Sequence, residues 1–170
     1  MKPESQEIYN KLLDNLDGMV KIYRGLLEVV RKEKEILIEA QLDQLNENNR
    51  VKEDLLLKSR TQELARIALV DDLRRMEMIR KDEVRLLDLA VHFGGSEGDK
   101  LRNMHSVLTL LIKRVQGLNK QNEGLVNSAL QSVTGAMNNI KQTLSDKGTY
   151  ANKGAMKDSS TQPQLVSREA

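Results

Sequence analysis

Two histidines and a run of carboxylates are the side chains in this sequence that could carry out acid–base or metal chemistry. His92 and His105 each lack a carboxylate or a second histidine at ligand spacing, so neither predicts a metal site or a general base. The acidic residues between positions 77 and 85 alternate with basic ones, which is typical of a solvated helix face. The glycines of segment 94–98 follow no strand and precede no Gly-Lys-Ser, so they do not predict a phosphate-binding loop. We therefore expect no enzyme activity, no cofactor and no metal.

The composition narrows the classes of partner. The 170 residues include no cysteine, and lysine plus arginine exceed aspartate plus glutamate by only two charges. Because the basic residues are interleaved with acidic ones, no concentrated basic face is present, and we expect no nucleic-acid partner. The longest apolar run, Val107–Ile112, is too short to span a bilayer, and the first residues contain no apolar signal segment. These features predict a cytoplasmic protein without stable membrane insertion.

The first periodic segment predicts a long helix with a heptad seam. Ser5 is a candidate N-cap. Spacings of four and three residues connect the apolar positions that follow, and this is the pattern of helices that pack along narrow seams. These positions are Leu12, Leu16, Met19, Tyr23, Leu26 and Val30. Asparagine and aspartate then favour a break at Gln41–Asp43.

Two further helical runs follow the break. The second is expected at about Gln44–Val91 and the third at about Lys100–Leu144. Between them, Phe93–Asp99 contains three glycines and predicts a loop, with Gly94 as a left-handed C-cap. Only a few aromatic residues are available to build a core, and the two prolines stand near the chain ends. The sequence thus predicts an all-α fold, an elongated antiparallel bundle or coiled coil of about three long helices, formed by residues 1–145.

The last 25 or so positions, 146–170, turn polar. They contain too little apolar surface to offset the entropy of ordering, and they predict a flexible tail.

The second half of the third helical run is unusual because it is nearly uncharged. Between Val115 and Ile140 only Lys120 and Glu123 are charged, and several glycines and asparagines weaken the intrinsic helicity. An apolar stripe nevertheless runs along it: Leu125, Ala129, Val133, Met137, Ile140 and Leu144. Two interpretations stay open. The stripe either completes the bundle core, as most helical stripes do, or binds a helix of another protein.

Short motifs in a fixed order make this chain resemble the FlgN family of flagellar type III export chaperones, over about residues 10–154. The motifs are Leu-Leu-Glu at 26–28, Lys-Glu-Lys-Glu-x-Leu at 32–37, Asp-Gln-Leu at 43–45, Lys-Glu-x-Leu-Leu at 52–56 with Arg60 and Arg66 downstream, Asn-x-x-Asn-x-x-Leu at 119–125, and Thr-Tyr followed by Gly at 149–154. The Asp-Gln-Leu segment is more compact than the Asp-x-x-x-Leu usual in the family.

The resemblance implies a cytoplasmic chaperone for hook–filament junction (hook-associated) proteins. Such a chaperone would bind the terminal amphipathic helix of its client through the C-terminal helical region, prevent premature association, and deliver the client to the export gate of the flagellar export apparatus and its ATPase complex. By position, Tyr150 corresponds to a tyrosine linked to docking on that apparatus. The alternative is a structural coiled-coil or adaptor protein that self-assembles through its heptad seams, and a homo-oligomer is possible in the free state.

Overall fold

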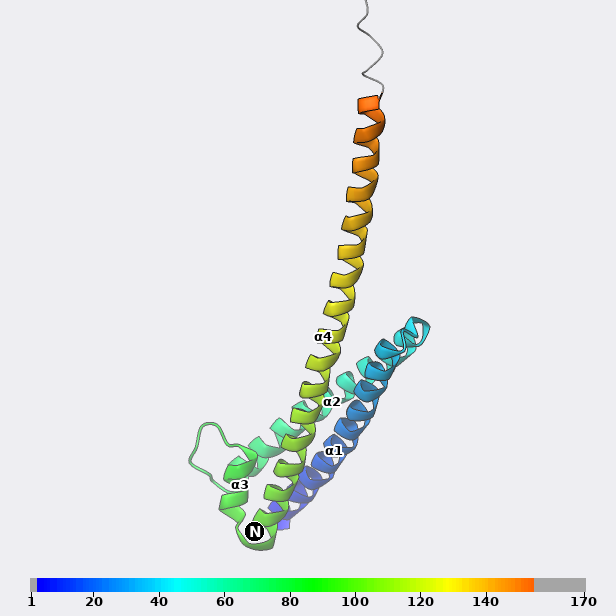
Figure 1. The fold of residues 1–170 in the computed structure, drawn as a ribbon. Helices are drawn as coiled ribbons and strands as arrows, with labels where there is room; N and C mark the ends of the chain where they lie inside the picture. The colour runs from blue at the N-terminus through cyan, green and yellow to red at the C-terminus, as the bar shows by residue number, and fades with distance from the viewer. Residues whose placement is uncertain (1–2, 155–170) are drawn as a thin grey trace, which may run out of the picture. The chain divides into compact units, whose positions relative to one another are not determined.

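The computed structural model describes the backbone of residues 3–154 and the side chains of residues 3–145. The described chain is all-α, and within it no strand is present. Its helices are α1 (Pro3–Ile38), α2 (Leu42–Met76), α3 (Leu86–Phe93) and α4 (Gly95–Gly154), coloured in chain order in Figure 1. Contacts divide the chain after Val126 into two compact units. The first contains α1 to α3 and the start of α4, and the second is described here through the rest of α4.

Helices α1 and α2 form an antiparallel hairpin. Asn15 Nδ2 of α1 donates to the backbone carbonyl of Gln62 at 3.1 Å, and Asn48 Nδ2 of α2 donates to that of Val29 at 3.2 Å. The chain reverses at residues 39–41, where Ala40 has a φ of +54°. The helix break expected at Gln41–Asp43 is therefore confirmed to within a few residues.

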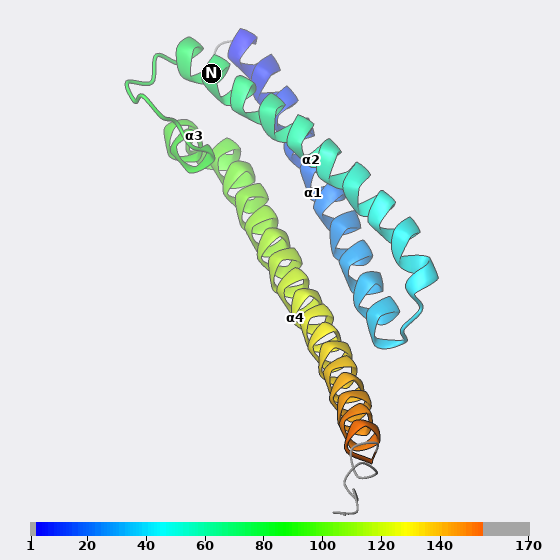
Figure 2. The ribbon, with the colours of Figure 1, turned by 90° about the horizontal axis from the view of Figure 1, so that it is seen from above.

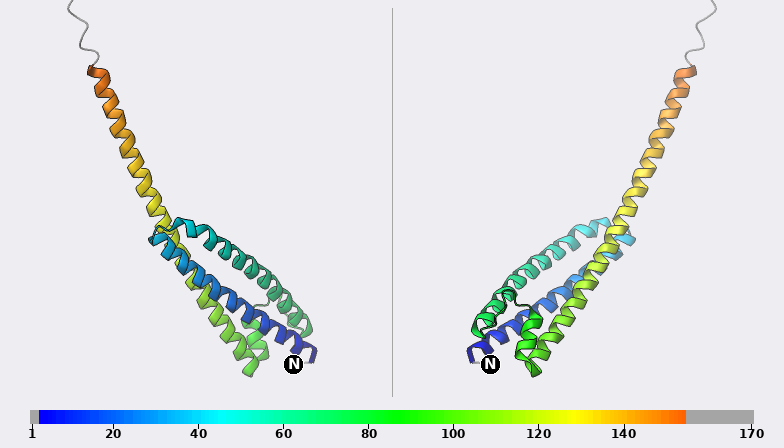
Figure 3. Two further views of the ribbon diagram at one scale, coloured as in Figure 1. Left: turned by 90° about the vertical axis from the view of Figure 1, so that its right-hand side faces the viewer. Right: turned by 90° about the vertical axis from the view of Figure 1, so that its left-hand side faces the viewer.

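The first part of α4 runs alongside α1 in the same direction. Tyr9 Oη donates to the Glu97 carbonyl at 2.7 Å near one end, and Asn122 Nδ2 donates to the Val30 carbonyl at 2.9 Å near the other. Figures 2 and 3 show this segment beside the α1–α2 hairpin from three directions. Because α2 runs opposite to both, the first unit is an up-down-up arrangement of three long segments.

The heptad seam of α1 forms the centre of the core. Five of its six predicted positions are buried, and the sixth, Tyr23, is partly buried. Around them lie the buried residues of the other segments: Val70, Leu73, Leu86, Leu89, Ala90, Leu101, Leu108, Leu111 and Val115. Full burial of one such leucine stabilises the fold by roughly 1.5–3 kcal/mol, so this seam dominates the stability of the unit.

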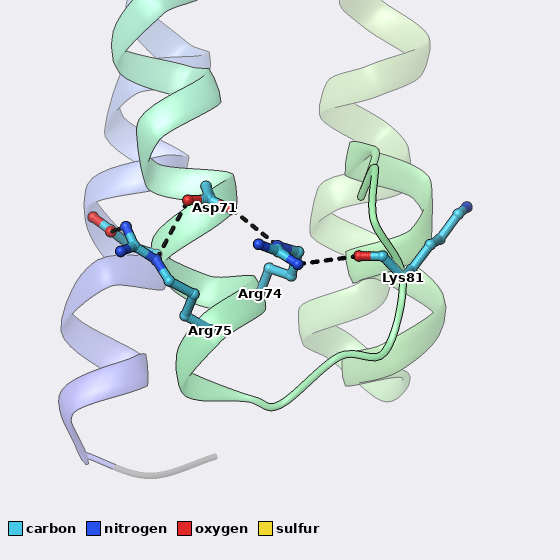
Figure 4. A network of polar contacts seen from close by, with 5 residues as sticks. Asp71, Arg74, Arg75 and Lys81 are labelled. Atoms are coloured by element: carbon cyan, nitrogen blue, oxygen red, sulfur yellow. Dashed lines mark hydrogen bonds and ion pairs between the residues drawn. The ribbon is translucent and has the colours of Figure 1, made fainter.

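The prediction of one helix from Gln44 to Val91 is wrong. Helix α2 ends at Met76, residues 77–85 form a connection, and the short α3 follows, so four helices occupy the described chain where about three were expected. Local sequence favours helix here, but the connection is stabilised by contacts beyond its own turn. Arg74 Nη1 donates to the Lys81 carbonyl at 3.3 Å, while Asp71 binds Arg74 and Arg75 (Figure 4).

Helix α3 begins with a cap formed by an acidic side chain. The backbone N–H of Arg85 donates to Asp88 Oδ2 at 2.8 Å, and Lys81 Nζ lies 2.7 Å from Asp88 Oδ1. Both interactions lower the pKa of Asp88, the lysine contact more than the backbone one. Aspartate three residues after the N-cap position is a recognisable capping signal, and it could have predicted this second break.

The loop between α3 and α4 is shorter than predicted. Only Gly94 separates α3 from α4, and its positive φ of +60° confirms the predicted glycine cap, although its ψ of −169° differs from that of the αL conformation. Gly98 lies inside the first turns of α4, so close to the Ala90 carbonyl that a Cβ would collide with it. The prediction of a loop over Phe93–Asp99 is therefore wrong. Gly98 has no side chain, and this allows α3 and α4 to meet at a tight elbow.

Two other expectations differ from the structure at the chain ends. Ser5 lies within α1 and is buried, so it is not the N-cap of that helix. Helix α4 continues to Gly154, although a polar tail was expected from residue 146. Residues 155–170 lie outside the described residues, and the flexibility of the tail stays a prediction.

Candidate functional site

The candidate binding surface is an apolar row on the second unit, within α4. Leu130, Val133, Met137, Ile140 and Leu144 follow spacings of three and four residues, which place them on one side of the helix. Their exposed fractions lie between 54 and 65%. We call these five residues the α4 stripe.

The structure places every described residue of the predicted site on the surface. Ala129 is exposed together with the α4 stripe, and Leu125, which belongs to the first unit, is exposed at 37%. Leu130 was missing from the predicted site, although its position three residues before Val133 is a visible signal. The predicted stripe contains Leu125 and Ala129 in its place.

Three hydroxyl groups around the α4 stripe are hydrogen-bonded within their own helix. Thr134 Oγ1 donates to the Leu130 carbonyl at 2.8 Å, and Ser132 Oγ and Thr143 Oγ1 make the same contact with the carbonyl four residues back at 3.0 and 2.9 Å. Hydroxyls that already have a protein acceptor lose less hydration when the surface is covered. These three hydroxyls therefore add less to the cost of covering the α4 stripe than hydroxyls without a protein acceptor would.

Within the first unit, a buried polar cluster fixes α4 to both other long helices. Glu33 Oε2 of α1 accepts from Asn122 Nδ2 at 2.9 Å and from Lys52 Nζ of α2 at 2.8 Å. Asn122 is only 3% exposed, and its Oδ1 atom is buried without a hydrogen-bond partner. A buried asparagine tolerates few alignments of its neighbours, so this cluster selects one register of the three helices.

A comparison with protein-family models now gives the family. The model described as FlgN protein matches residues 1–158 of the chain. The chain belongs to the FlgN family. No curated protein and no solved structure matches it.

FlgN-family proteins are flagellar export chaperones. In this FlgN-family chain the two asparagines of the Asn-x-x-Asn motif differ in burial. Asn122 is buried in the polar cluster, whereas Asn119 is half-buried. The motif therefore has a structural role in this protein, at the helix that also carries the α4 stripe.

The histidines do not converge on a catalytic arrangement in the described chain. His92 lies in the last turn of α3, with its Nε2 3.4 Å from Glu77 Oε2. The pKa of Glu77 is lowered, first by the Ser5 hydroxyl and then by His92, against the opposing effect of burial. His105 is half-buried on α4. Among the described residues, no group of three potential ligands could hold a metal ion, and no helix is long and apolar enough to cross a membrane.

The predicted docking residue Tyr150 has no described side chain. It falls in the last turns of α4, beyond residue 145, so its role stays a proposal.

Proposed function

We propose that this FlgN-family protein acts in the cytoplasm and binds the terminal amphipathic helix of hook–filament junction proteins through the α4 stripe. The observation that supports the proposal best is an exposed, charge-poor row of five large apolar side chains at heptad-like spacing. An amphipathic helix buries its own apolar face on such a row, with the same i, i+3, i+4, i+7 spacing as anchors. Covering that face would prevent the client from associating before export.

The composition of the α4 stripe suits a client helix better than a fixed structural partner. Met137 adapts its shape to different neighbours, and the glycines nearby allow small adjustments of the helix. Gly124 and Gly135 have no other side chain within 4 Å of where a Cβ would stand. Packing within the described chain therefore does not require a glycine at either position.

The direct test is binding of a client helix by a doubly charged variant. Val133→Asp with Ile140→Asp should abolish binding of a terminal-helix peptide from a hook–filament junction protein in isothermal titration calorimetry, because two carboxylates would have to be desolvated. Leu57→Asp on α2, an equally exposed leucine, is the matched control and should bind normally. Unchanged binding by the double variant would refute the assignment.

The alternative, a structural coiled coil, is favoured by the same regular spacing and predicts a different result. In that case the double variant would dissociate a homo-oligomer, and no client peptide would bind the unmodified chain.

Delivery to the export gate is a separate part of the proposal. Tyr150→Ala should leave thermal stability and client binding unchanged while reducing export of the client and swimming. Normal motility of the variant would remove Tyr150 from the proposed docking site.

A further inference from the structure

The α4 stripe follows the heptad positions of a coiled coil. Leu130, Met137 and Leu144 occupy the a positions, and Val133 and Ile140 occupy the d positions. The positions that border such a row on its two sides are e and g, and their charges set the choice and the orientation of the partner helix. In the second unit these flanking residues are Asn127, Thr134 and Lys141 at e, and Ala129, Ala136 and Thr143 at g.

Lys141 is the one charged residue at these flanking positions. No other residue from 124 to 145 is charged, although charged residues make up 31% of the chain, so the depletion is specific to this segment. The next charges in the sequence are Glu123, which belongs to the first unit, Asp146 and Lys147. By the same heptad spacing, Asp146 falls at a c position, outside the flanks, and Lys147 falls at d and ends the apolar row.

Lys141 lies beside the C-terminal end of the α4 stripe and is exposed. It follows Met137 by four residues and precedes Leu144 by three, so it neighbours both on the helix surface. No acidic residue stands three or four positions before or after Lys141, so its own helix provides no ion pair at the spacing where such pairs form. A carboxylate on a partner helix would therefore meet this ammonium group without a competitor at those positions of α4.

A second copy of the α4 stripe would not supply that carboxylate. In a parallel pair of helices e positions approach g positions, and in an antiparallel pair each kind approaches its own. Because the e and g positions within 127–145 include no acidic residue, Lys141 would meet only uncharged side chains or a second lysine. Charge complementarity therefore favours a foreign helix that carries an acidic residue.

We propose that the client helix bound by the α4 stripe carries one carboxylate beside Lys141 and uncharged side chains along the rest of its two flanks. Lys141 then selects both the partner and its register, because a helix shifted by one heptad would lose its only ion pair. Charged flanks elsewhere would lose hydration against Thr134 or Ala136 without gaining an opposite charge. This inference rests on the proposed function and adds the chemistry of the client.

The first test measures binding of a terminal-helix peptide from a hook–filament junction protein by isothermal titration calorimetry. Lys141→Gln should weaken binding about threefold and Lys141→Glu about tenfold, as expected for loss and for reversal of an exposed ion pair. Raising sodium chloride from about 0.05 to about 0.5 M should abolish the difference between the parent chain and Lys141→Gln. Gln142→Glu is the matched control: it changes the net charge by the same amount as Lys141→Gln at an exposed f position, and it should bind like the parent.

The outcomes of this test separate the inference from the proposed function. A parent chain that binds no terminal-helix peptide would refute the proposed function and the inference with it. A parent chain that binds the peptide with an affinity that both Lys141 variants leave unchanged would overturn the inference alone.

A charge exchange identifies the carboxylate. Each acidic residue of the peptide is replaced by lysine in turn, and one of these peptides should bind Lys141→Glu more tightly than it binds the parent chain. If every lysine-substituted peptide prefers the parent chain or binds both chains equally, no carboxylate of the client pairs with Lys141 and the inference is wrong.

The uncharged flank is tested at Thr134, one heptad before Lys141. Thr134→Glu and Thr134→Lys should each weaken binding of the same peptide about threefold or more relative to Thr134→Gln, which gives the baseline for side-chain size, because the client presents no charge of either sign there. Circular dichroism should be unchanged, since position 134 is exposed. Tighter or equal binding by either charged variant would show that the client flank is charged or lies elsewhere, and would overturn the inference.

Discussion

Asn122 on α4 donates one side-chain amide to two acceptors on α1, the Val30 carbonyl and Glu33 Oε2, each at 2.9 Å. The two contacts link residues that are about ninety positions apart in the chain, and the Asn122 side chain that makes them is buried. The amide therefore fixes where α4 leaves the core of the first unit.

Replacing Asn122 by alanine should lower the free energy of unfolding by about 1–3 kcal/mol, because Glu33 loses a buried donor. Asn122→Asp should cost more at neutral pH, since it places a second carboxylate beside Glu33. Urea unfolding followed by circular dichroism measures both effects. The control is Asn119→Ala, at the half-buried first position of the motif, where a loss below about 0.5 kcal/mol is expected. Equal losses at the two asparagines would contradict the role of the cluster.

Replacing two glycines of α4 by alanine should change the stability of the protein in opposite directions. At Gly98 the new Cβ would collide with the Ala90 carbonyl, so Gly98→Ala should destabilise the protein by about 1–3 kcal/mol. At Gly117 no atom other than the helix's own backbone lies within 4 Å, so Gly117→Ala should stabilise it by about 0.5–1 kcal/mol through higher helix propensity. Melting temperatures of the two variants test the elbow, and a Gly98→Ala protein as stable as the parent would show that the elbow can open freely.

Lowering the pH should remove the stabilisation that the Glu77 carboxylate gives to the folded state. Its pKa is lowered in the folded state by Ser5 and then by His92, so the folded chain binds this proton less readily than the unfolded chain. The resulting stabilisation is present above the ordinary glutamate pKa of about 4.3 and is lost as the pH falls through the lowered value. The difference in melting temperature between the parent and Glu77→Gln should therefore be largest near neutral pH and shrink on acidification.

The α4 stripe and the core seam of the same helix should differ in their tolerance of charge. Val133→Asp with Ile140→Asp should change the free energy of unfolding by less than about 0.5 kcal/mol per site, because both side chains are already exposed. Leu108→Asp, a position that is 7% exposed, should cost about 3 kcal/mol or more. A double variant that unfolds at room temperature would show that the α4 stripe is part of a core.

The sequence by itself determined the local features of this protein. Apolar spacings of three and four specify the helix face of Leu12 to Val30, and Gly94 ends a helix because its left-handed backbone is strained for other residues. Those signals lie within a few neighbouring positions, so they are readable without a partner. The motifs in their order also pointed to the family that the family model confirmed.

Only the tertiary structure decided which faces are covered and where the chain turns without a glycine or proline. The local sequence of residues 77–85 favours helix, but burial of Leu86 and Leu89 of α3 in the core of the first unit stabilises another path, and such packing outweighs intrinsic propensities of a few tenths of a kcal/mol per residue. The apolar residues of the α4 stripe and of the α1 seam likewise follow the same spacings of three and four, so the sequence alone does not distinguish the two faces. One is exposed and the other buried because burial depends on what packs against a face, and the spacing of residues along a single helix contains no information about that neighbour.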